Sequence, residues 1–576
     1  MHPDAYNKIN GLLTYSQGDD TNGASITAHA YHGKWKSSDQ IPVTAQVNPT
    51  PSTPYGVGYF GTLNPTDGGH SQRYSLQGEW HRQSTNSESR IAAYVFYYDM
   101  DLFSDFTYYL VDHNRGDQFE QQDRRWVGGF DAHHTVFSTW FDRKMSNTFG
   151  LQLRNDWINN GLYRTESRKR TTKTDYSATG ISFNDSICTI YTSTVSISVD
   201  GGTPTTFASA CPALPPTTER DNFTDVIGSA YVENKIQWAN KFRSVVALRG
   251  DDEKFVVTSL AYPSDIVTLS DGTTTVNAAN SGSASKFLPS PKASLIFGPW
   301  ANTEFYLQGG FGFHSNDGRG ATQQVEPVSP ANPYHGTLNT KITPLVQTKG
   351  GEIGARTVAV PHLQSTFALW YLRSNSELLQ DGDTGGTSAS EQSSNRYGLE
   401  WANYCTPTEH LAVDFNISDS RAQFTQIDPD DATQYVTNSS ITINGNPVGS
   451  FYAQQNDPGG KLVPEAVRVV ISSGITLHDY KGFSSSLRLR YFGPRDLTSD
   501  GLYQSSQTVL LNGEVGYQFF RKWHVTAEFL NMLDRKDADI DYAYVYQIAP
   551  AAAPGFGRVN HPTEPFLFRF ALGRSF

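Results

Sequence analysis

Strand-like segments recur along the whole chain, and the connections between them alternate between short and long. We expect tight turns at residues 18–22, 145–147, 240–241, 299–302, 361–362, 406–409, 479–482 and 520–522. We expect long connections at residues 164–224, 261–286, 315–344, 374–395, 420–462, 493–503 and 538–565. Barrels in outer membranes show this alternation, with short turns in the periplasm and long loops outside the cell. The pattern predicts an all-β, antiparallel, up-and-down transmembrane β-barrel.

The C-terminal segment shows most clearly the two-faced character that such a strand needs. Alternate side chains of a strand point to opposite faces. One face carries Phe566, Phe568, Phe570, Leu572 and Phe576, interrupted only by Arg574. The other face carries Leu567, Arg569, Ala571, Gly573 and Ser575. A tilted strand of about 10 residues crosses a bilayer, so this segment is long enough to face lipid on one side and a lumen on the other.

Composition excludes two classes of protein. Aromatic residues make up 13% of the chain, but its mean hydropathy is −0.47. It has no apolar run of 18 residues, which excludes a helical membrane protein. The net charge of −12 and the lack of a basic tract argue against a nucleic-acid partner. Composition alone does not separate a barrel from a large soluble all-β protein.

The number of strands is informative because membrane barrels of bacteria contain an even number. We count about 19 strands by their period-two pattern. If the last strand ends in the periplasm, an odd count makes the first strand, residues 10–17, run in the same direction. We therefore expect an odd number of strands to be missing before it. The N-terminal residues also have no features of a signal peptide.

Three cysteines are present, and two of them lie in the same predicted long loop. Cys188 and Cys211 are separated by residues rich in Ser, Thr and Pro. In an oxidising compartment we expect them to form a disulfide that staples this loop. Cys405 has no obvious mate. The alternative is three unrelated thiols.

No motif predicts catalysis, a resident metal or a cofactor. His133 and His134 are adjacent and would point to opposite faces of a strand, and the other histidines lack zinc spacing. The acidic run 428–431 lacks the Gly and the distal Glu of a calcium loop, so a solvated loop tip is the simpler interpretation. A Gly-x-Ser-x-Gly elbow is absent.

Several segments resemble the β-barrel of TonB-dependent outer-membrane receptors. They are WKSSDQIP (35–42), DGGHSQRYSL (67–76), TEFYLQGGFGFH (303–314), GGEIGAR (350–356), RYFGPR (490–495), LNMLD (530–534), and HP (561–562) with EP (564–565). Each motif alone is weak. Together they occur in the family's order, span most of residues 5–576, and end in a C-terminal Phe. The resemblance is weakest at 164–224 and 420–462.

The resemblance implies an architecture in which this chain is one part. A complete barrel of the family has 22 strands, so the 19 counted here would be the fourth to the last. The family also carries an N-terminal TonB box and a plug domain, and nothing in this sequence resembles either. We therefore expect residues 1–576 to be a single barrel domain, truncated at its N-terminal side and lacking the plug.

The resemblance also implies a function and a set of partners. We expect TonB-dependent uptake of a scarce solute, such as a ferric siderophore, cobalamin or an oligosaccharide, across the outer membrane of a Gram-negative bacterium. Expected partners are outer-membrane lipid, TonB through a plug and box not in this chain, and a small-molecule ligand. Phe576 is expected to be the signal for the barrel-assembly machinery. We expect a monomer, with the two least family-like loops carrying specificity.

Four residues are candidates for lining the ligand path. Arg488 and Arg490 share the predicted lumen face, with Arg468 nearby, and could form an electropositive ladder for an anionic ligand. The alternative is that these arginines pair with Glu514, Glu528 or plug carboxylates. His314, at the end of the Gly-Phe-rich segment, is the fourth candidate.

Two other functional classes stay open at this point. A passive porin-like channel or surface adhesin would share the barrel but would not couple to TonB. An outer-membrane enzyme would need a site motif, and we find none. We therefore expect a transporter and not an enzyme.

Overall fold

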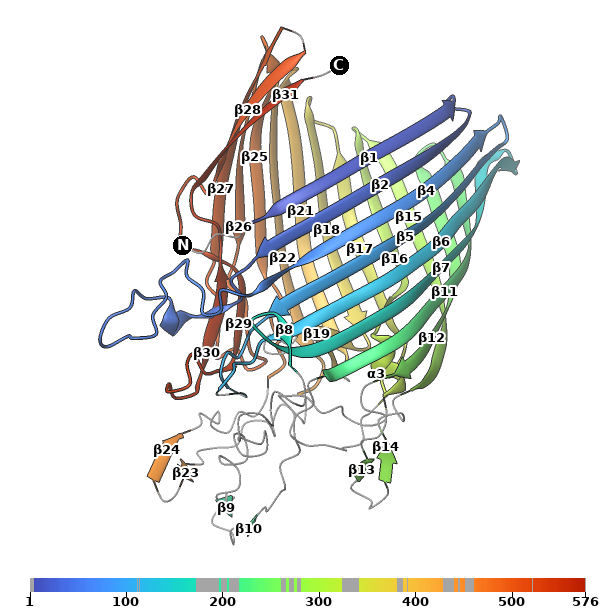
Figure 1. Ribbon diagram of the computed structural model, residues 1–576. Coiled ribbons are helices and arrows are strands. Elements are labelled where there is room, and N and C mark those ends of the chain that lie inside the picture. The colour runs from blue at the N-terminus through green and yellow to red at the C-terminus, as the bar shows by residue number, and fades with distance from the viewer. Residues whose placement is uncertain are drawn as a thin grey trace.

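One antiparallel sheet of 20 strands dominates the computed structural model (Figure 1), which describes residues 5–110, 112, 114–171, 196–197, 205–206, 217–260, 266–268, 274–276, 281–323, 341–380, 387–390, 392–427, 440–443, 446–450, 460–520 and 522–574. Its strands are β1 (Asn7–Gly18), β2 (Asn22–Lys36), β4 (Gly68–Gln83), β5 (Ser87–Ser104), β6 (Phe119–Trp140), β7 (Arg143–Glu166), β8 (Lys169–Arg170), β11 (Thr217–Ala239), β12 (Phe242–Ser259), β15 (Gly282–Trp300), β16 (Thr303–Ser315), β17 (Leu345–Thr357), β18 (Leu363–Ser374), β21 (Ser394–Thr408), β22 (Leu411–Phe424), β25 (Val469–Tyr480), β26 (Phe483–Phe492), β27 (Thr508–Phe519), β28 (Trp523–Leu530) and β31 (Leu567–Arg574).

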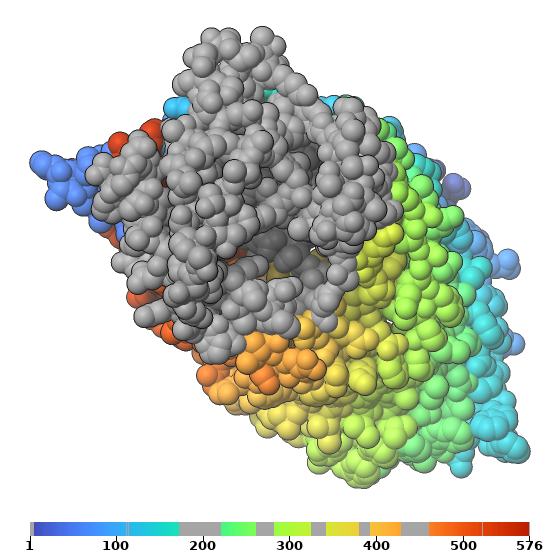
Figure 2. Space-filling model, turned by 90° about the horizontal axis from the view of Figure 1, so that it is seen from below, coloured from blue at the N-terminus to red at the C-terminus, as the bar shows by residue number. Residues whose placement is uncertain are grey.

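Each long strand pairs with the next long strand of the chain, so the sheet is an up-and-down meander. β8 has only two residues and pairs with the end of β7. The other 19 strands follow one another around the wall in chain order, as the colours of Figure 2 show from the long-loop end. This confirms the predicted fold class and the count of about 19 strands.

The remaining elements are short and lie outside this wall. They are β3 (Ile41–Pro42), η1 (Val43–Ala45), β9 (Ser196–Ile197), β10 (Thr205–Thr206), β13 (Ile266–Thr268), β14 (Thr274–Val276), α3 (Gly318–Thr322), β19 (Glu377–Gln380), β20 (Thr387–Ser390), β23 (Ser440–Ile443), β24 (Asn446–Ser450), β29 (Ala538–Tyr546) and β30 (Gly555–Pro562). In the described part of the chain, no helix has the length and apolar character needed to cross a membrane.

The predicted alternation of connections is confirmed, with several boundaries corrected. The turns at one end of the sheet contain at most five residues, whereas connections such as 37–67, 493–507 and 531–566 lie at the other end. The turn predicted at 145–147 lies inside β7, and the real turn is 141–142. Phe141 and Asp142 both adopt positive φ there (47° and 58°), without a glycine to mark the turn.

Two of the long loops are shorter than predicted, and a third begins later, because the strands continue past the apolar segment. β15 begins at Gly282 and not after 286, β11 begins at Thr217 and not after 224, and β22 ends at Phe424 and not before 420. Once a strand leaves an apolar environment, both of its faces meet water, so the period-two pattern that marks it in the sequence fades.

The two faces of the C-terminal strand are those predicted, as far as it is described. Phe568, Phe570 and Leu572 are 55%, 66% and 60% exposed on one face. On the other face, Arg569 contacts Glu564, with 3.7 Å between Nη2 and Oε2. Phe576 lies outside the described residues.

The two edges of the sheet, β1 and β31, are not paired with each other in the described structure. β1 pairs only with β2, and β31 pairs only with β28. Figure 1 shows the two strands diverging toward the short-turn end and approaching each other toward the long-loop end. All residues of β1 are exposed.

A small folded unit connects the two edges on the long-loop side. We call it the loop clasp, and it consists of residues 37–67, 105–110, 112, 114–118 and 531–566. Its three-stranded sheet pairs β29 with β30 and β30 with β3, placing Ile41 opposite Asn560. The N-terminal and C-terminal colours therefore meet on one side of the rim in both views (Figures 1 and 2).

The loop clasp has its own apolar core and its own backbone hydrogen bonds. Its core contains the buried side chains Phe106, Tyr544, Tyr546 and Val559. The Tyr109 amide donates to the Gln547 carbonyl at 2.9 Å, and the Gln547 amide donates to the Thr107 carbonyl at 3.1 Å. Because these partners lie more than 400 residues apart in sequence, the clasp ties the first and last parts of the chain together.

Among the described residues, three carboxylates are concentrated inside the loop clasp without a cationic side chain paired to them. Asp67 is 0% and Asp105 3% exposed, and Asp39 is half-buried. All three carboxylates accept hydrogen bonds from neutral groups. The backbone amide of Asp105 donates to Asp39 (2.7 Å), the Gln118 side chain donates to Asp67 (2.8 Å), and the Asn64 side chain donates to Asp105 (2.9 Å). One oxygen of Asp67, Oδ2, has no hydrogen-bond partner among the described residues.

The charged forms of these carboxylates are therefore unfavourable. Burial raises the pKa of Asp39 to about 6, and burial together with the neighbouring carboxylates raises the pKa of Asp67 and Asp105 well above the ordinary value. Arg168 lies close by, but its guanidinium donates to the backbone carbonyls of Thr66 and Asp67.

The clasp is expected to be more stable in acid than at neutral pH. A carboxyl with a raised pKa binds its proton more tightly in the folded state, so stability falls as the pH rises through about 6. We expect the free energy of opening β29, from hydrogen exchange corrected for intrinsic rates, to be about 1–3 kcal/mol higher at pH 4.5 than at pH 7.5. Asp67→Asn should remove much of this difference by raising the value at pH 7.5.

Asp20→Asn, in an exposed turn at the opposite end of the sheet, is the matched control and should keep the wild-type pH dependence. Equal protection of β29 at the two pH values in the wild type would contradict the prediction.

Candidate functional site

The face of the sheet opposite the large apolar side chains is polar and is the candidate functional surface. On β26, Arg488 and Arg490 lie opposite Asn512 and Leu510 of β27. The ladder continues through β25, where Gly474 is opposite Arg488, to Asp414 of β22. In a barrel this face lines the lumen, because the other face carries the side chains suited to lipid.

Arg488 is held by an ion pair two strands away. Its Nη2 lies 3.2 Å from Oδ1 of Asp414, and the two side chains are 41% and 15% exposed. Gly474 lies between them in the ladder. A Cβ at this position would be 2.6 Å from Asp414 Oδ1 and 3.1 Å from Arg488 Nη2, so the missing side chain makes room for the pair.

The other two candidate arginines differ from each other. Arg468 lies just before β25, with its Nε 3.5 Å from Asp419 Oδ1. Arg490 is exposed, and no carboxylate in the described part of the chain forms an ion pair with it. Arg488 is therefore paired with Asp414 and Arg468 with Asp419. Neither arginine pairs with Glu514 or Glu528.

His314 lies on the same type of face but far from the arginines. It is on β16, in alternation with Glu304, Tyr306 and Gln308. Five long strands separate β16 from β26, which is on the order of 25–30 Å along the sheet. Its Nε2 is buried without a hydrogen-bond partner among the described residues. The four candidates thus do not form one cluster within the sheet.

A second charged area on the same face was not singled out from the sequence. It spans β6, β7, β11 and β12. Arg125 pairs with Asp123 and reaches Asp156 at 3.8 Å, and Arg154 pairs with Asp156 at 2.7 Å.

The area continues across the next two strands. Arg249 pairs with the fully buried Asp251 at 2.8 Å, and Ser229 donates to the same carboxylate at 2.6 Å. A signal was present in the sequence, because Asp123/Arg125, Arg154/Asp156 and Arg249/Asp251 are opposite charges two residues apart. That spacing places both charges on one face of a strand.

The short-turn end of this face carries a third ionic group. Glu304 on β16 accepts from Arg243 of β12 at 2.6 Å and from Arg356 of β17 at 2.6 Å. Its side chain is 19% exposed and that of Arg243 is 20% exposed. One carboxylate therefore serves two arginines from two different strands.

The remaining predicted residues have separate outcomes. Cys188, Cys211 and the acidic run 428–431 lie outside the described residues, as does Phe576. Cys405, on β21, is a free thiol. No group of three or more His, Cys, Asp or Glu side chains in the described ranges is arranged to hold a metal ion.

Taken together, the polar face carries three groups of paired charges on different strands. Its ion pairs fix most charges in place. Arg490 is the candidate whose charge is available to a ligand. The face is thus suited to binding or conduction.

Comparison with known proteins places this architecture in one family. Residues 3–532 match the family described as TonB dependent receptor-like, beta-barrel. No curated protein matches the chain in sequence.

Solved structures with the same fold are only distantly related in sequence. The ferric yersiniabactin uptake receptor FyuA from Yersinia pestis is 11% identical, with a TM-score of 0.62 over 99% of this chain and 71% of the receptor. The siderophore receptor PiuA from Acinetobacter baumannii is 14% identical, with a TM-score of 0.64 over 100% and 76%. The copper transporter OprC is 13% identical, with a TM-score of 0.62 over 100% and 72%.

The ionic groups on the polar face should differ in their contribution to stability. Glu304→Gln leaves two arginines without their shared carboxylate and should lower the free energy of unfolding by about 1–2 kcal/mol. Asp414→Asn releases only the half-exposed Arg488 and should cost less than about 1 kcal/mol. Urea titration of the protein in lipid vesicles, followed by tryptophan fluorescence, measures both. A larger loss for Asp414→Asn would contradict this ranking.

Proposed function

The chain belongs to the TonB-dependent receptor family, and from this membership we propose that it forms the wall of an energy-coupled uptake receptor in the outer membrane. The family consists of receptors for TonB-dependent solute uptake, found in the outer membranes of Gram-negative bacteria. The proposal is supported above all by the meander of 19 long strands, whose long loops all lie at one end.

The proposed cargo is a scarce solute present outside the cell at low concentration. Proteins with this fold include a ferric yersiniabactin receptor, a siderophore receptor and a copper transporter. We place a ferric siderophore first and keep cobalamin and oligosaccharides as further candidates. The cargo is a substrate that passes through and not a resident cofactor.

We propose that Arg468, Arg488 and Arg490 guide an anionic cargo along one wall, with His314 on another wall. The proposal depends mainly on Arg490, because its exposed charge forms no ion pair in the described part of the chain. The connections predicted at 164–224 and 420–462 would contribute specificity, since binding residues are concentrated on loops held by a rigid scaffold.

Energy coupling and assembly need partners. We propose that TonB acts through a plug and TonB box, and that the barrel-assembly machinery inserts the chain as a monomer using the C-terminal Phe576. Transport, and not catalysis, is the proposed activity.

The decisive experiment measures whether uptake depends on energy. Cells lacking the endogenous gene should regain accumulation of one radiolabelled solute from a panel of ferric siderophores, cobalamin and oligosaccharides when the full gene is restored. Accumulation should stop when TonB is deleted or the proton gradient is collapsed. Uptake that continues in both conditions would instead identify a passive channel, and binding without any uptake would identify an adhesin.

A charge reversal tests the role of Arg490. If the cargo is anionic, Arg490→Glu should raise its apparent dissociation constant at least about tenfold, because an exposed attractive charge becomes repulsive. Arg488→Ala should have a smaller effect because Asp414 already neutralises that charge. Lys349→Glu, an equally large charge change at an exposed position on the apolar face of β17, is the control and should leave binding unchanged. An unchanged affinity for Arg490→Glu would remove Arg490 from the ligand path.

A further inference from the structure

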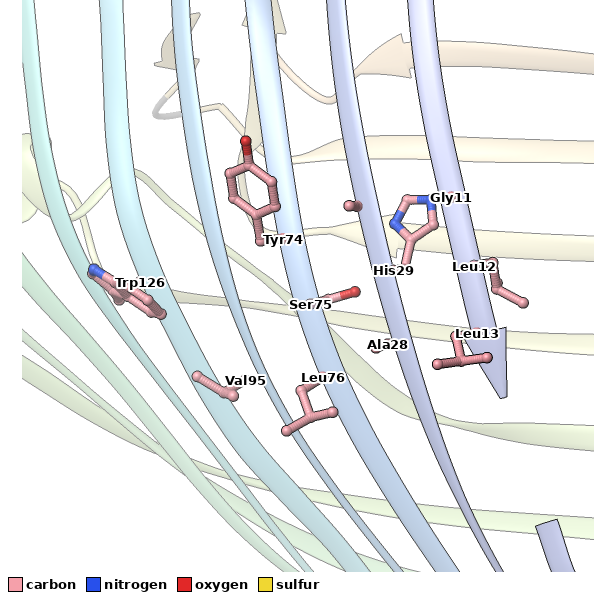
Figure 3. A pocket seen from close by; sticks show the side chains of 11 residues that line it. Gly11, Leu12, Leu13, Ala28, His29, Tyr74, Ser75, Leu76, Val95 and Trp126 are labelled. Carbon is pink, nitrogen blue, oxygen red and sulfur yellow. The ribbon is translucent and has the colours of Figure 1, made fainter. Parts of the chain in front are cut away.

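The apolar face of the first strands contains a shallow trough with a volume of about 640 Å³ (Figure 3). Small residues form its floor: Gly11 of β1 pairs with Ala30 of β2, and Ala28 pairs with Leu13. Larger side chains flank it, namely Tyr74, Leu76, Val95 and Trp126. Such a depression between bulky apolar side chains has the shape and polarity to hold an alkyl chain.

The trough begins at a row of aromatic side chains. Tyr74, Tyr97, Trp126 and Trp157 are register partners across β4, β5, β6 and β7. The rings of Tyr97 and Trp126 lie 5.1 Å apart. Tyr and Trp collect where a membrane meets water. From this row the trough extends along Ala28 and Leu76 toward the short-turn end, which is the direction of the lipid interior.

A group of basic side chains lies on the other side of this row, on the same face of β2. His32, Lys34 and Lys36 continue the alternation that begins at Ala28 and Ala30, and all three are exposed. From Ala30 to Lys34 is about 13 Å along the strand. The basic group therefore lies at the loop-side end of the trough, where the headgroup of a lipid would lie.

The acids nearby are already paired. On β5, Asp99 and Asp101 share Arg124, at 3.3 Å and 3.9 Å, and Asp101 also lies 3.5 Å from His70. In the described part of the chain, neither Lys34 nor Lys36 forms an ion pair. Arg168 adds a further positive charge at the same end, since its guanidinium lies 5.4 Å from the Phe103 ring centroid and donates to backbone carbonyls only.

We propose that this face binds one phosphorylated glycolipid of the outer leaflet, with an acyl chain in the trough and phosphate groups on Lys34 and Lys36. The inference rests on the proposed placement in the outer membrane. Ammonium groups bind phosphate as point charges, and the trough supplies an apolar surface for the chain. A lipid is favoured over a protein partner because charge and apolar surface follow each other along one strand, in the order in which a lipid carries them.

The test is native mass spectrometry of the purified full-length protein in detergent, titrated with lipid A carrying two phosphates. The wild type should bind one molecule. Lys34→Gln with Lys36→Gln should weaken binding at least tenfold, and Ala28→Phe, which fills the trough, should weaken it similarly. Lys254→Gln, exposed on the same apolar face of β12, is the matched control and should bind like the wild type.

Three further probes separate the contributions of phosphate and chain. Dephosphorylated lipid A should bind the wild type weakly, and the double lysine variant should bind it no worse than the wild type does. Phosphorylated sugar without acyl chains should bind neither protein. Phosphatidylglycerol should bind at least tenfold more weakly than lipid A, and equal affinity for the two lipids would overturn the glycolipid assignment.

Two controls keep the result interpretable. Each variant must show the wild-type heat-induced shift on gels, which reports a folded barrel, and a misfolded Ala28→Phe is replaced by Ala30→Phe. Equal lipid A binding by the double lysine variant and the wild type would overturn the proposal, whatever the uptake assay shows. Failure of energy-dependent uptake, with lipid binding intact, would instead contradict the proposed transport function alone.

Discussion

The backbone hydrogen-bond ladder between neighbouring strands is the interaction on which the rest of this structure depends. In an apolar surrounding, an unpaired amide or carbonyl costs several kcal/mol, so a wall of strands must pair each strand with the next. The ladder also fixes which side chains share a face, because the side-chain period of a strand is two. Every functional statement about Arg490 or Lys34 rests on that register.

The loop clasp meets the same requirement by a different physical route. The edge strands β1 and β31 share no ladder in the described structure, yet β3 and β30 pair outside the wall. Water is available there, so the two-residue pairing of β3 with β30 suffices, and a small apolar core around Val559 supports it. Its cost is electrostatic. Among the described residues, Asp39, Asp67 and Asp105 are withdrawn from solvent without a cationic side chain paired to them, which makes this connection sensitive to pH.

Much of the wall could be predicted because its rule is local. Alternation in 566–574, the tight turn at 479–482 and the long connection 316–344 each follow from a few neighbouring residues. The boundaries of β15 and β22 could not be predicted as well, since neither strand end carries a clear period-two pattern of apolar residues. The clasp could not be predicted at all. Pairing Ile41 with Asn560 depends on tertiary proximity, and no short sequence pattern encodes a contact over that separation.

Only part of the candidate site could be predicted, because alternation along one strand is local whereas contacts between strands are not. The shared face of Arg488 and Arg490 follows from alternation alone. Their partners Asp414 and Asp419 lie on another strand, so only the register could identify them. The network at Asp123, Arg125 and Asp156 was missed although its two-residue charge spacing was visible in the sequence.

Register also connects the two functional proposals. The ladders from β1 through β2 to β4 run without a bulge, so Gly11, Ala30 and Tyr74 lie on one face without interruption. A slip of one residue in β2 would move Lys34 and Lys36 to the lumen side and place Tyr31 and His29 in the lipid. Such a slip would bring uncompensated positive charge into the solute path and polar rings into the membrane. The apolar floor of the trough and its basic end therefore both favour the same register of β2. In that register, Lys34 and Lys36 lie on the opposite face from the proposed solute path, to which Arg490 is assigned.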